Sequence, residues 1–243
     1  KLLEGKTALI TGASRGIGYA AAIKLASKGY DIAASCIKNT NLLDTLRKEI
    51  QKLNAKCTIY TGDMGNYKDA ASFFNLIQKN HGRADVLVNN AGISYVGLIQ
   101  NMSPDEWQHI IHTNLDSVFN CCKLAIPLML KEKSGRIINI SSVWGCTGAS
   151  TEAAYSATKG GINAFTMALA KELAPSNIQV NAIACGIIDT SMNSFLSQEE
   201  LDAIKEEIPA CRLGTPEDVA RLICQLAEST SYFTGQVIKL DVG

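Results

Sequence analysis

Short apolar segments rich in β-branched residues alternate along this chain with longer polar or amphipathic segments. The apolar segments cover residues 6–12, 31–37, 56–63, 84–92, 135–142, 178–186 and 235–243. Helical periods follow the first five, one ending at Lys28 and the others over about 41–53, 67–81, 104–131 and 153–173. Strands that alternate with helices are typical of βαβ units in a parallel sheet covered on both faces. The pattern predicts one α/β domain over residues 1–243, a Rossmann-type doubly wound fold with a seven-stranded parallel sheet.

A glycine-rich turn, "TGASRGIG", joins the first predicted strand to the first predicted helix. Glycine permits a tight turn and lets the backbone approach a pyrophosphate, and the helix N-terminus offers N–H groups to the phosphates. Many strand–helix turns carry glycine for backbone reasons alone, but this position at the start of a doubly wound pattern favours a dinucleotide. We therefore expect cofactor contacts from Gly12, Ser14, Arg15, Gly16, Ile17 and Gly18.

The end of the second strand favours NADP(H). An enzyme that uses NAD usually places Asp or Glu there to bind the ribose 2′-hydroxyl, whereas a 2′-phosphate requires cations. This strand ends in "SCIKN", with Lys38 and no carboxylate, and Arg15 in the glycine turn can reach the same phosphate. The alternative is that Lys38 is an ordinary surface lysine.

Tyr155 and Lys159 are four residues apart in a predicted helix, which places them on one face. A free tyrosine has a pKa of about 10, too high for an efficient acid or base at neutral pH. We expect the Lys159 ammonium, helped by an oxidised nicotinamide ring, to lower that pKa. Ser142 ends the fifth strand, where a second donor to a carbonyl oxygen would be needed. The three residues predict reduction of a ketone, although a tyrosine and a lysine at this spacing also occur by chance.

The charge and composition of the chain argue against a protein that binds nucleic acid or a membrane. The chain has 23 basic and 23 acidic residues, so no overall field attracts nucleic acid or a membrane surface. No apolar run approaches the roughly 20 residues needed to span a bilayer, and the first residues do not resemble a signal peptide. We expect a soluble, cytoplasmic protein without a nucleic-acid or membrane partner.

The eight cysteines are interpreted as buried thiols. They occupy positions 36, 57, 121, 122, 146, 185, 211 and 224, with no C-x-x-C motif and no histidine at metal-ligand spacing. We therefore expect a reducing compartment, no disulfide and no metal site.

Five motifs in order resemble the short-chain dehydrogenase/reductase superfamily over essentially the whole chain. They are "TGASRGIG", "NNAG" at 89–92, Asn114 in "HTNLDSVF", Ser142, and "YSATK" at 155–159. The resemblance implies a catalytic tetrad of Asn114, Ser142, Tyr155 and Lys159, in which Asn114 helps to hold a water that relays protons from Lys159. It implies further cofactor contacts from Asp63 (to the adenine), Asn89, Ala91, Gly92, Gly186, Ile188 and Thr190, and from Tyr155 and Lys159 themselves. Without the resemblance, Asn114 reads as an ordinary helix residue.

One position departs from the family pattern. The family usually has Pro-Gly after the sixth strand, and this chain has Cys185-Gly186. Because the proline restraint on φ is lost, we expect a somewhat looser loop there, with an inert thiol favoured over a reactive one. The polar segment over about 189–208 is expected to be a substrate lid.

The resemblance leaves the substrate open. The overall likeness is to 3-oxoacyl-(acyl-carrier-protein) reductases, and Lys131 and Lys133 could dock an acidic carrier protein. A local likeness in "SSVWGCTGAS" and "KELAPS" is to elongation factor P 5-aminopentanone reductases. For such a substrate Glu152 would bind an ammonium group. The alternative is that Glu152 is an ordinary first-turn glutamate, which the helix dipole favours. A non-catalytic nucleotide sensor on the same fold is a third alternative.

A homotetramer is also implied by the resemblance. The helices over 104–131 and 153–173 carry apolar residues beyond those needed for the stripe that faces the sheet, and their alternative interpretation is ordinary core. These residues are Val118, Leu124, Ala164, Phe165 and Ala168.

Overall fold

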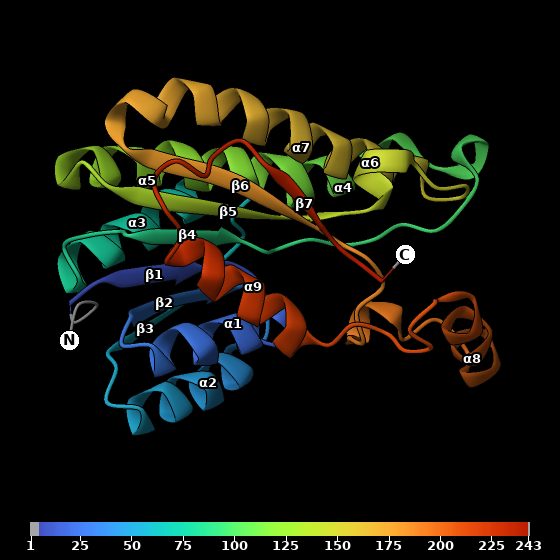
Figure 1. Ribbon diagram of the computed structural model, residues 1–243, viewed down its shortest axis with the longest axis horizontal. Helices are drawn as coiled ribbons and strands as arrows, with labels where there is room; N and C mark the ends of the chain where they lie inside the picture. Colours follow the sequence, from blue (N-terminus) through green and yellow to red (C-terminus); the bar gives the residue numbers. More distant parts are fainter. Residues whose placement is uncertain (1–4, 243) are drawn as a thin grey trace.

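Seven parallel strands form one sheet at the centre of the computed structural model (Figure 1). The strand order is β3-β2-β1-β4-β5-β6-β7. The chain adds strands outward on one side of β1 up to β3, and then on the other side from β4 to β7. The strands are β1 Thr7–Ile10, β2 Asp31–Cys36, β3 Cys57–Thr61, β4 Val86–Asn89, β5 Gly135–Ser142, β6 Ile178–Cys185 and β7 Val237–Leu240. The predicted fold class is confirmed. The structure describes residues 5–242, so residues 1–4 of the predicted domain and Gly243 of the predicted seventh strand lie outside the described residues.

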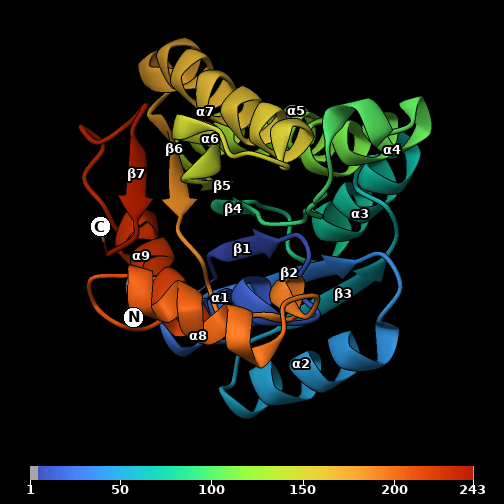
Figure 2. The same cartoon turned by 90° about the vertical axis from the view of Figure 1, so that its right-hand side faces the viewer.

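Helices cover both faces of the sheet, as Figures 1 and 2 show from two directions. On one face lie α1 Gly16–Ser27, α2 Thr40–Lys52 and α9 Pro216–Ala227, and on the other lie α3 Tyr67–Asn80, α4 Pro104–Ile111, α5 Ser117–Glu132 and α7 Ala153–Leu173. The short α6 Trp144–Thr147 and the longer α8 Gln198–Glu207 lie beyond the carboxyl ends of the strands. Within residues 5–242, no helix combines the length and the apolar character that crossing a bilayer requires.

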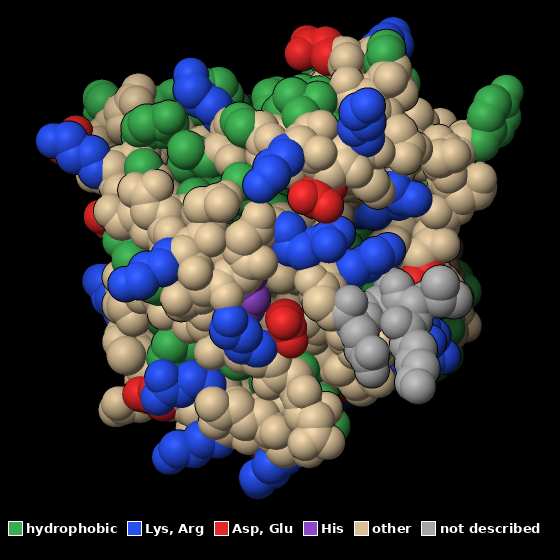
Figure 3. Space-filling model, turned by 90° about the vertical axis from the view of Figure 1, so that its left-hand side faces the viewer, with side chains coloured by type: hydrophobic (Ala, Val, Ile, Leu, Met, Phe, Trp, Pro, Cys, Tyr) green, Lys and Arg blue, Asp and Glu red, His purple; other side chains and the backbone are tan. Residues whose placement is uncertain are grey.

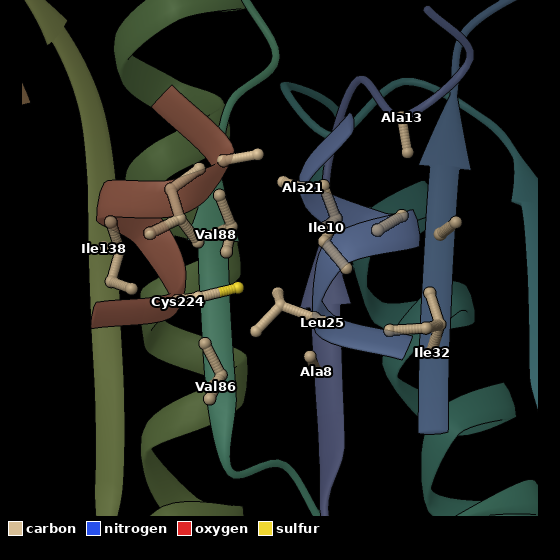
Figure 4. Close-up of a cluster of buried hydrophobic side chains, with 14 of the residues drawn as sticks. Ala8, Ile10, Ala13, Ala21, Leu25, Ile32, Val86, Val88, Ile138 and Cys224 are labelled. Carbon is tan, nitrogen blue, oxygen red and sulfur yellow. The ribbon is translucent and has the colours of Figure 1, made fainter. Parts of the chain in front are cut away.

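Alternating side chains of the strands fill two separate apolar layers. Ala8 and Ile10 of β1 belong to the layer under α1 and α9, whereas Leu9 belongs to the layer under α5 and α7. This follows from the two-residue period of a strand. Figure 4 shows the first layer, where Leu25 of α1 and Cys224 of α9 point toward the strand side chains. Both faces being covered explains why the strands read as almost continuous apolar runs.

The helix α9 was not predicted from the sequence pattern, although its start carries a clear signal. Thr215 Oγ1 accepts a hydrogen bond from the Asp218 amide at 3.2 Å, and Asp218 Oδ2 accepts one from the Thr215 amide at 3.1 Å. Pro216 occupies the first helical position. A reciprocal capping box with an N-terminal proline is a recognisable helix start. The helix buries Val219 and Ile223 against the sheet.

The predicted helix over 104–131 is interrupted. A π-helical turn, His112–Asp116, separates α4 from α5. Within α5, Val118 is buried in the core, so the expectation that it faces a partner subunit was wrong. Leu124 and Phe165 also pack against the core, whereas Ala164 and Ala168 on α7 are exposed.

The cysteines divide into three groups. Cys36, Cys121, Cys122, Cys185 and Cys224 are buried, Cys57 is half-buried, and Cys146 and Cys211 are exposed. All eight are free thiols. The interpretation as buried thiols therefore fails for the two exposed residues, of which Cys146 lies in the short helix α6 and Cys211 in a bend after α8.

Candidate active site

The carboxyl ends of β1 and β4 are tied together beneath the glycine turn. Thr11 Oγ1 accepts hydrogen bonds from the amides of Asn90 and Ala91, both at 3.0 Å. The Asn90 side-chain amide donates to the Gly12 carbonyl oxygen at 3.0 Å. Gly12 has φ +65°, and a Cβ there would lie 2.9 Å from the Ala91 Cα. Only glycine therefore suits position 12, and "NNAG" packs directly beside the turn.

The start of α1 forms a cradle for phosphate. Gly16 has φ +58°, and a Cβ there would lie 3.3 Å from Thr190 Cγ2 across the site. Among the described residues no side chain caps this helix, and its first turn contains no acidic residue. The first amides of a helix have no intrahelical acceptor, so they remain available to a phosphate. Glycines whose absent side chains leave this room fit a dinucleotide.

The predicted adenosine-phosphate residues lie at the neighbouring edge. A shallow pocket is lined by Lys38, Asn39, Thr40, Asn41 and Leu42 at the start of α2. Arg15 and Lys38 are both exposed, and α2 has no acidic residue in its first turn. This cationic edge also fits a phosphate.

Ser14 and Asn89 are among the predicted cofactor residues that are buried. Ser14 is 8% exposed, and its side chain partly opposes the rise that burial causes in the pKa of the Cys36 thiol at the end of β2. Asn89 is 3% exposed, and its side-chain amide donates to Asn139 Oδ1 at 2.8 Å. The Asn89 side chain thus supports β4 and β5 from within the core. Ile17, at the start of α1, is half-buried.

Lys159 is the buried centre of the predicted tetrad. It is 4% exposed, and its Nζ donates to the Ile140 carbonyl oxygen of β5 at 2.8 Å. Its Nζ lies 5.6 Å from the centroid of the Tyr155 ring, one turn earlier on α7. A Cβ on Gly92 would lie 3.6 Å from Lys159 Nζ and 3.3 Å from Asn114 Oδ1. The structure therefore brings Gly92, Asn114, Tyr155 and Lys159 together.

Asn114 lies inside the π-turn and is fully buried. Its amide donates to the Ile93 carbonyl oxygen at 2.9 Å and to Thr158 Oγ1 at 3.1 Å. Its Oδ1 accepts a hydrogen bond from the Ile93 amide at 2.8 Å. Such π-turns within helices frequently mark functional sites. The side chain thus joins the segment after β4 to α7, which sequence pattern alone did not indicate.

Burial sets the pKa values of the tyrosine and the lysine. Burial raises the pKa of Tyr155 to about 12, and a hydrogen bond with Ser142 only partly opposes that rise. Burial also lowers the pKa of Lys159 to about 8. Without the cofactor, removal of the tyrosine from water therefore dominates its pKa. The expectation that Lys159 and an oxidised nicotinamide ring together lower this pKa stays a prediction.

Ser142 and Cys185 end neighbouring strands side by side. They are partners in the parallel register of β5 and β6. The Val143 amide donates to the Cys185 carbonyl oxygen at 2.9 Å, and the Trp144 amide donates to Ser142 Oγ at 3.2 Å. Cys185 is thus held as the last residue of β6, and the looser loop expected after it from the missing proline stays a prediction. Burial raises the pKa of the Cys185 thiol to about 12, as expected for an inert thiol.

The segment after β6 leaves the sheet and returns. Gly186 donates to the Leu240 carbonyl oxygen at 3.0 Å, and Ile188 forms a parallel bridge with Gly214. The predicted lid over 189–208 contains a 3₁₀ turn, Ser191–Asn193, and α8. Because α8 has no buried residue, it is held only weakly against the domain.

Glu152 has a specific partner beside the tyrosine. It is half-buried, and burial raises its pKa while a hydrogen bond from the Trp144 side chain opposes the rise. Its charge contributes to the raised pKa of Tyr155. Its side chain makes no hydrogen bond to the α7 amides. The Trp144–Glu152 pair was not predicted, because the two residues are eight positions apart across a loop.

Two lysines suggested for docking lie at the wrong end of the sheet. Lys131 and Lys133 precede Gly135, the first residue of β5, whereas Ser142 is its last. A strand rises about 3.3 Å per residue, so roughly 23 Å separate its two ends. Figure 3 shows Lys and Arg side chains gathered on the face opposite the tetrad. Lys131 and Lys133 therefore do not lie near the pocket mouth, and the suggestion that they dock a carrier protein there was wrong.

Comparison with known proteins agrees with this architecture. The family model described as short chain dehydrogenase matches residues 6–201. The fold and the match define an oxidoreductase that acts on CH–OH or C=O groups with a nicotinamide cofactor, which excludes a non-catalytic sensor. This chain belongs to the short-chain dehydrogenase family.

Named relatives align over nearly their whole length. The chain is 40% identical over 242 residues to a Thermotoga maritima protein named 3-oxoacyl-[acyl-carrier-protein] reductase FabG, covering 99% of this chain and 98% of that protein. It is 38% identical over 239 residues to the Staphylococcus aureus protein of the same name, covering 98% and 97%. It is 40% identical over 243 residues to a Synechocystis 3-oxoacyl-[acyl-carrier-protein] reductase, covering 99% and 97%.

Proposed function

We propose that this protein is an NADPH-dependent ketone reductase of the 3-oxoacyl-(acyl-carrier-protein) reductase type. The observation that carries the proposal is the convergence of Ser142, Tyr155 and Lys159 beside Gly92. When bound, NADPH supplies the hydride. Tyr155 donates its phenolic proton to the ketone oxygen, which also accepts a hydrogen bond from Ser142. Lys159 stabilises the resulting phenolate through its charge, and Asn114 holds the proton relay beside it.

The cofactor preference for NADPH is supported by the cations at the 2′-phosphate position. Lys38 and Arg15 are exposed at the pocket edge, and Asp31 lies at the far end of β2. Asp44 lies inside α2 and forms an ion pair with Arg47 at 2.5 Å, so it is not free to bind a ribose hydroxyl. Asp63 is assigned to the adenine, and Ile188 and Thr190 to the nicotinamide amide.

A carrier-bound 3-oxoacyl thioester is the first substrate, because the full-length relatives carry that substrate in their names. A ketone that bears an ammonium group is the second. The specific observation for it is Glu152, whose partly desolvated carboxylate is held by Trp144 next to Tyr155. A carboxylate in that position would attract a cation and repel the anionic groups of a carrier arm.

The two substrates are separated by steady-state reduction of acetoacetyl thioester and of a small aminoketone with NADPH. The wild type is compared with Glu152→Gln, which keeps the side-chain shape and removes the charge. For the thioester proposal we expect thioester turnover and a KM for it that stays the same or falls in the variant. If only the aminoketone is reduced, and the KM for the aminoketone rises in Glu152→Gln, the aminoketone replaces the thioester as the proposed substrate. Absence of NADPH oxidation with either ketone would contradict both substrates.

We also propose a homotetramer assembled through α5 and α7. Phe119 on α5 is 50% exposed and Met167 on α7 is 45% exposed. Ala164 and Ala168 are exposed on the same helix as Met167. Large apolar side chains that share a face with small ones allow two helices to pack closely, which supports an interface.

A further inference from the structure

His112, which the proposed reaction does not use, opens the π-turn that contains Asn114. Its Nε2 lies 3.0 Å from Asp63 Oδ2, and its Nδ1 lies 3.8 Å from Asp116 Oδ2. Asp63 is in the loop between β3 and α3, 49 positions earlier in the chain. The imidazole therefore joins the turn that carries a catalytic residue to the loop that carries the predicted adenine ligand.

The fit between the loop and the π-turn is close. A Cβ on Gly65 would lie 2.6 Å from both His112 Nε2 and the His112 carbonyl oxygen. The buried Asn120 amide donates to the carbonyl oxygens of Met64 at 3.0 Å and Gly65 at 2.7 Å. The side chains of His112 and Asn120 thus both hold residues 63–65 against the π-turn and α5. A substitution at His112 therefore leaves the Asn120 contacts of the loop in place.

The hydrogen bonds of Asp63 leave room for a ligand. Its Oδ1 accepts from the Gly65 amide at 2.9 Å, and its Oδ2 is the partner of His112. Each carboxylate oxygen has two lone pairs, so each retains one for a further donor. The side chain of Asp63 is 35% exposed. The 6-amino group is the one N–H donor of the adenine ring, and it matches this acceptor.

We propose that His112 is a positioning residue for the adenine. Its Nε2–H donates to Oδ2 and holds the Asp63 carboxylate at one rotamer, so that the remaining lone pairs face the 6-amino group. The proposal rests on the assignment of a nicotinamide–adenine dinucleotide cofactor with Asp63 at its adenine. Because the same imidazole begins the π-turn, the adenine end and the Asn114 end of the site share one anchor.

The test measures dissociation constants by fluorescence titration for NADPH and for its hypoxanthine analogue, in which an oxo group replaces the 6-amino group. The ratio of the two constants reports the contacts of the 6-substituent and the adjacent N1, which gains a proton in the analogue, because every other part of the ligands is shared. We expect wild type to prefer NADPH about tenfold, as a charge-assisted hydrogen bond implies. His112→Leu should reduce the preference to about threefold or less, and His112→Gln should restore it, since its amide also donates.

His109→Leu is the matched control, because His109 is exposed one turn earlier on α4. It should keep the wild-type preference. If the thermal midpoint of His112→Leu falls far below wild type, His112→Asn takes its place, because its shorter amide does not reach Asp63. Equal weakening of both ligands in the His112 variant would overturn the proposal as a general structural effect.

Asp63→Ala separates the inference from the function on which it rests. Loss of the preference in Asp63→Ala but not in His112→Leu would overturn the role of His112 and leave the adenine contact standing. A preference that survives in Asp63→Ala, or that is absent from wild type, would overturn both the contact and the role of His112. NADPH turnover by wild type in either case would still support the reductase.

Discussion

Lys159 and Tyr155 lie one turn apart on α7, with the ammonium nitrogen 5.6 Å from the centre of the phenol ring. Burial acts on them in opposite directions, raising the pKa of Tyr155 to about 12 and lowering that of Lys159 to about 8. At neutral pH the pair therefore holds both of its protons, and the tyrosine is ready to act as a proton donor. Reduction of a ketone is the direction this state favours.

Tyr155→Phe should lower kcat by at least about a hundredfold, because it removes the proton donor and leaves the ring in place. The dissociation constant for NADPH, measured by fluorescence titration, should stay within about twofold of wild type, since only one hydroxyl is lost. Near-normal kcat in this variant would contradict the assignment of the tetrad.

The pH profile of kcat/KM should follow Lys159. Its pKa of about 8 means that the ammonium is charged below that pH and is lost above it. Because the charge stabilises the phenolate that forms, we expect kcat/KM to be level below about pH 8 and to fall roughly tenfold per unit above it. Initial rates between pH 6 and 10 check this. A level profile through the alkaline range would contradict it.

Lys38→Asp should reverse or largely erase the preference for NADPH over NADH. One charge-assisted bond to the 2′-phosphate corresponds to roughly a ten- to hundredfold difference in affinity, and a carboxylate would instead bind the 2′-hydroxyl. The measurement is kcat/KM for each cofactor. Lys48→Asp, on an exposed position of α2, is the control. Equal use of NADH and NADPH by wild type would refute the prediction.

Gly145→Ala should destabilise the protein and impair catalysis. A Cβ at position 145 would lie 2.6 Å from the Lys159 carbonyl carbon, so α6 must move away from α7. We expect a loss of about 1–3 kcal/mol in the free energy of unfolding by urea, together with a lower kcat. Gly161→Ala is the matched control, because its Cβ would lie 3.5 Å from Leu115 and the helix gains about 0.5–1 kcal/mol. Equal stability of the two variants would contradict this.

Met167→Glu should dissociate the proposed tetramer. Met167 is 45% exposed, and a charge buried in an apolar interface is costly unless it is paired. Light scattering at micromolar concentration should give a tetramer mass for wild type and a smaller mass for the variant. Gln51→Glu, at an exposed position of α2 on the other face of the sheet, adds the same single charge outside the proposed interface and is the control. A monomeric wild type would remove the basis of the prediction.

Local patterns predicted the parts of the fold that depend on nearby residues. The seven strands follow from short β-branched runs, and Tyr155 and Lys159 share a helix face because of their spacing alone. The glycine turn was predictable because Gly12 and Gly16 have positive φ values, which glycine adopts without steric cost. The helix α9 also has a local signal, the capping box of Thr215 and Asp218 with Pro216 between them, so its start is predictable from the sequence.

Other parts depend on residues distant in the chain. The π-turn holds Asn114 through Ile93, 21 positions away, and Thr158, 44 positions away, and its sequence has an ordinary helical period. The contact of His112 with Asp63 likewise has no local signature. The raised pKa of Tyr155 in the protein without cofactor has no local signature either, because burial, which dominates it, is a property of the folded chain.

The parallel bridge between Ile188 and Gly214 has a consequence for engineering this reductase. The Asp189 amide donates to the Gly214 carbonyl oxygen at 2.8 Å, and the Gly214 amide donates to the Ile187 carbonyl oxygen at 3.0 Å. Residues 189–213 therefore leave and rejoin the domain at a single joint, and α8 within them contributes nothing to the core. The part of this segment after Thr190 is an interchangeable cassette: grafting a homologous loop in place of residues 191–212 would alter ketone selection while Thr190 and the buried Leu213 stayed in place.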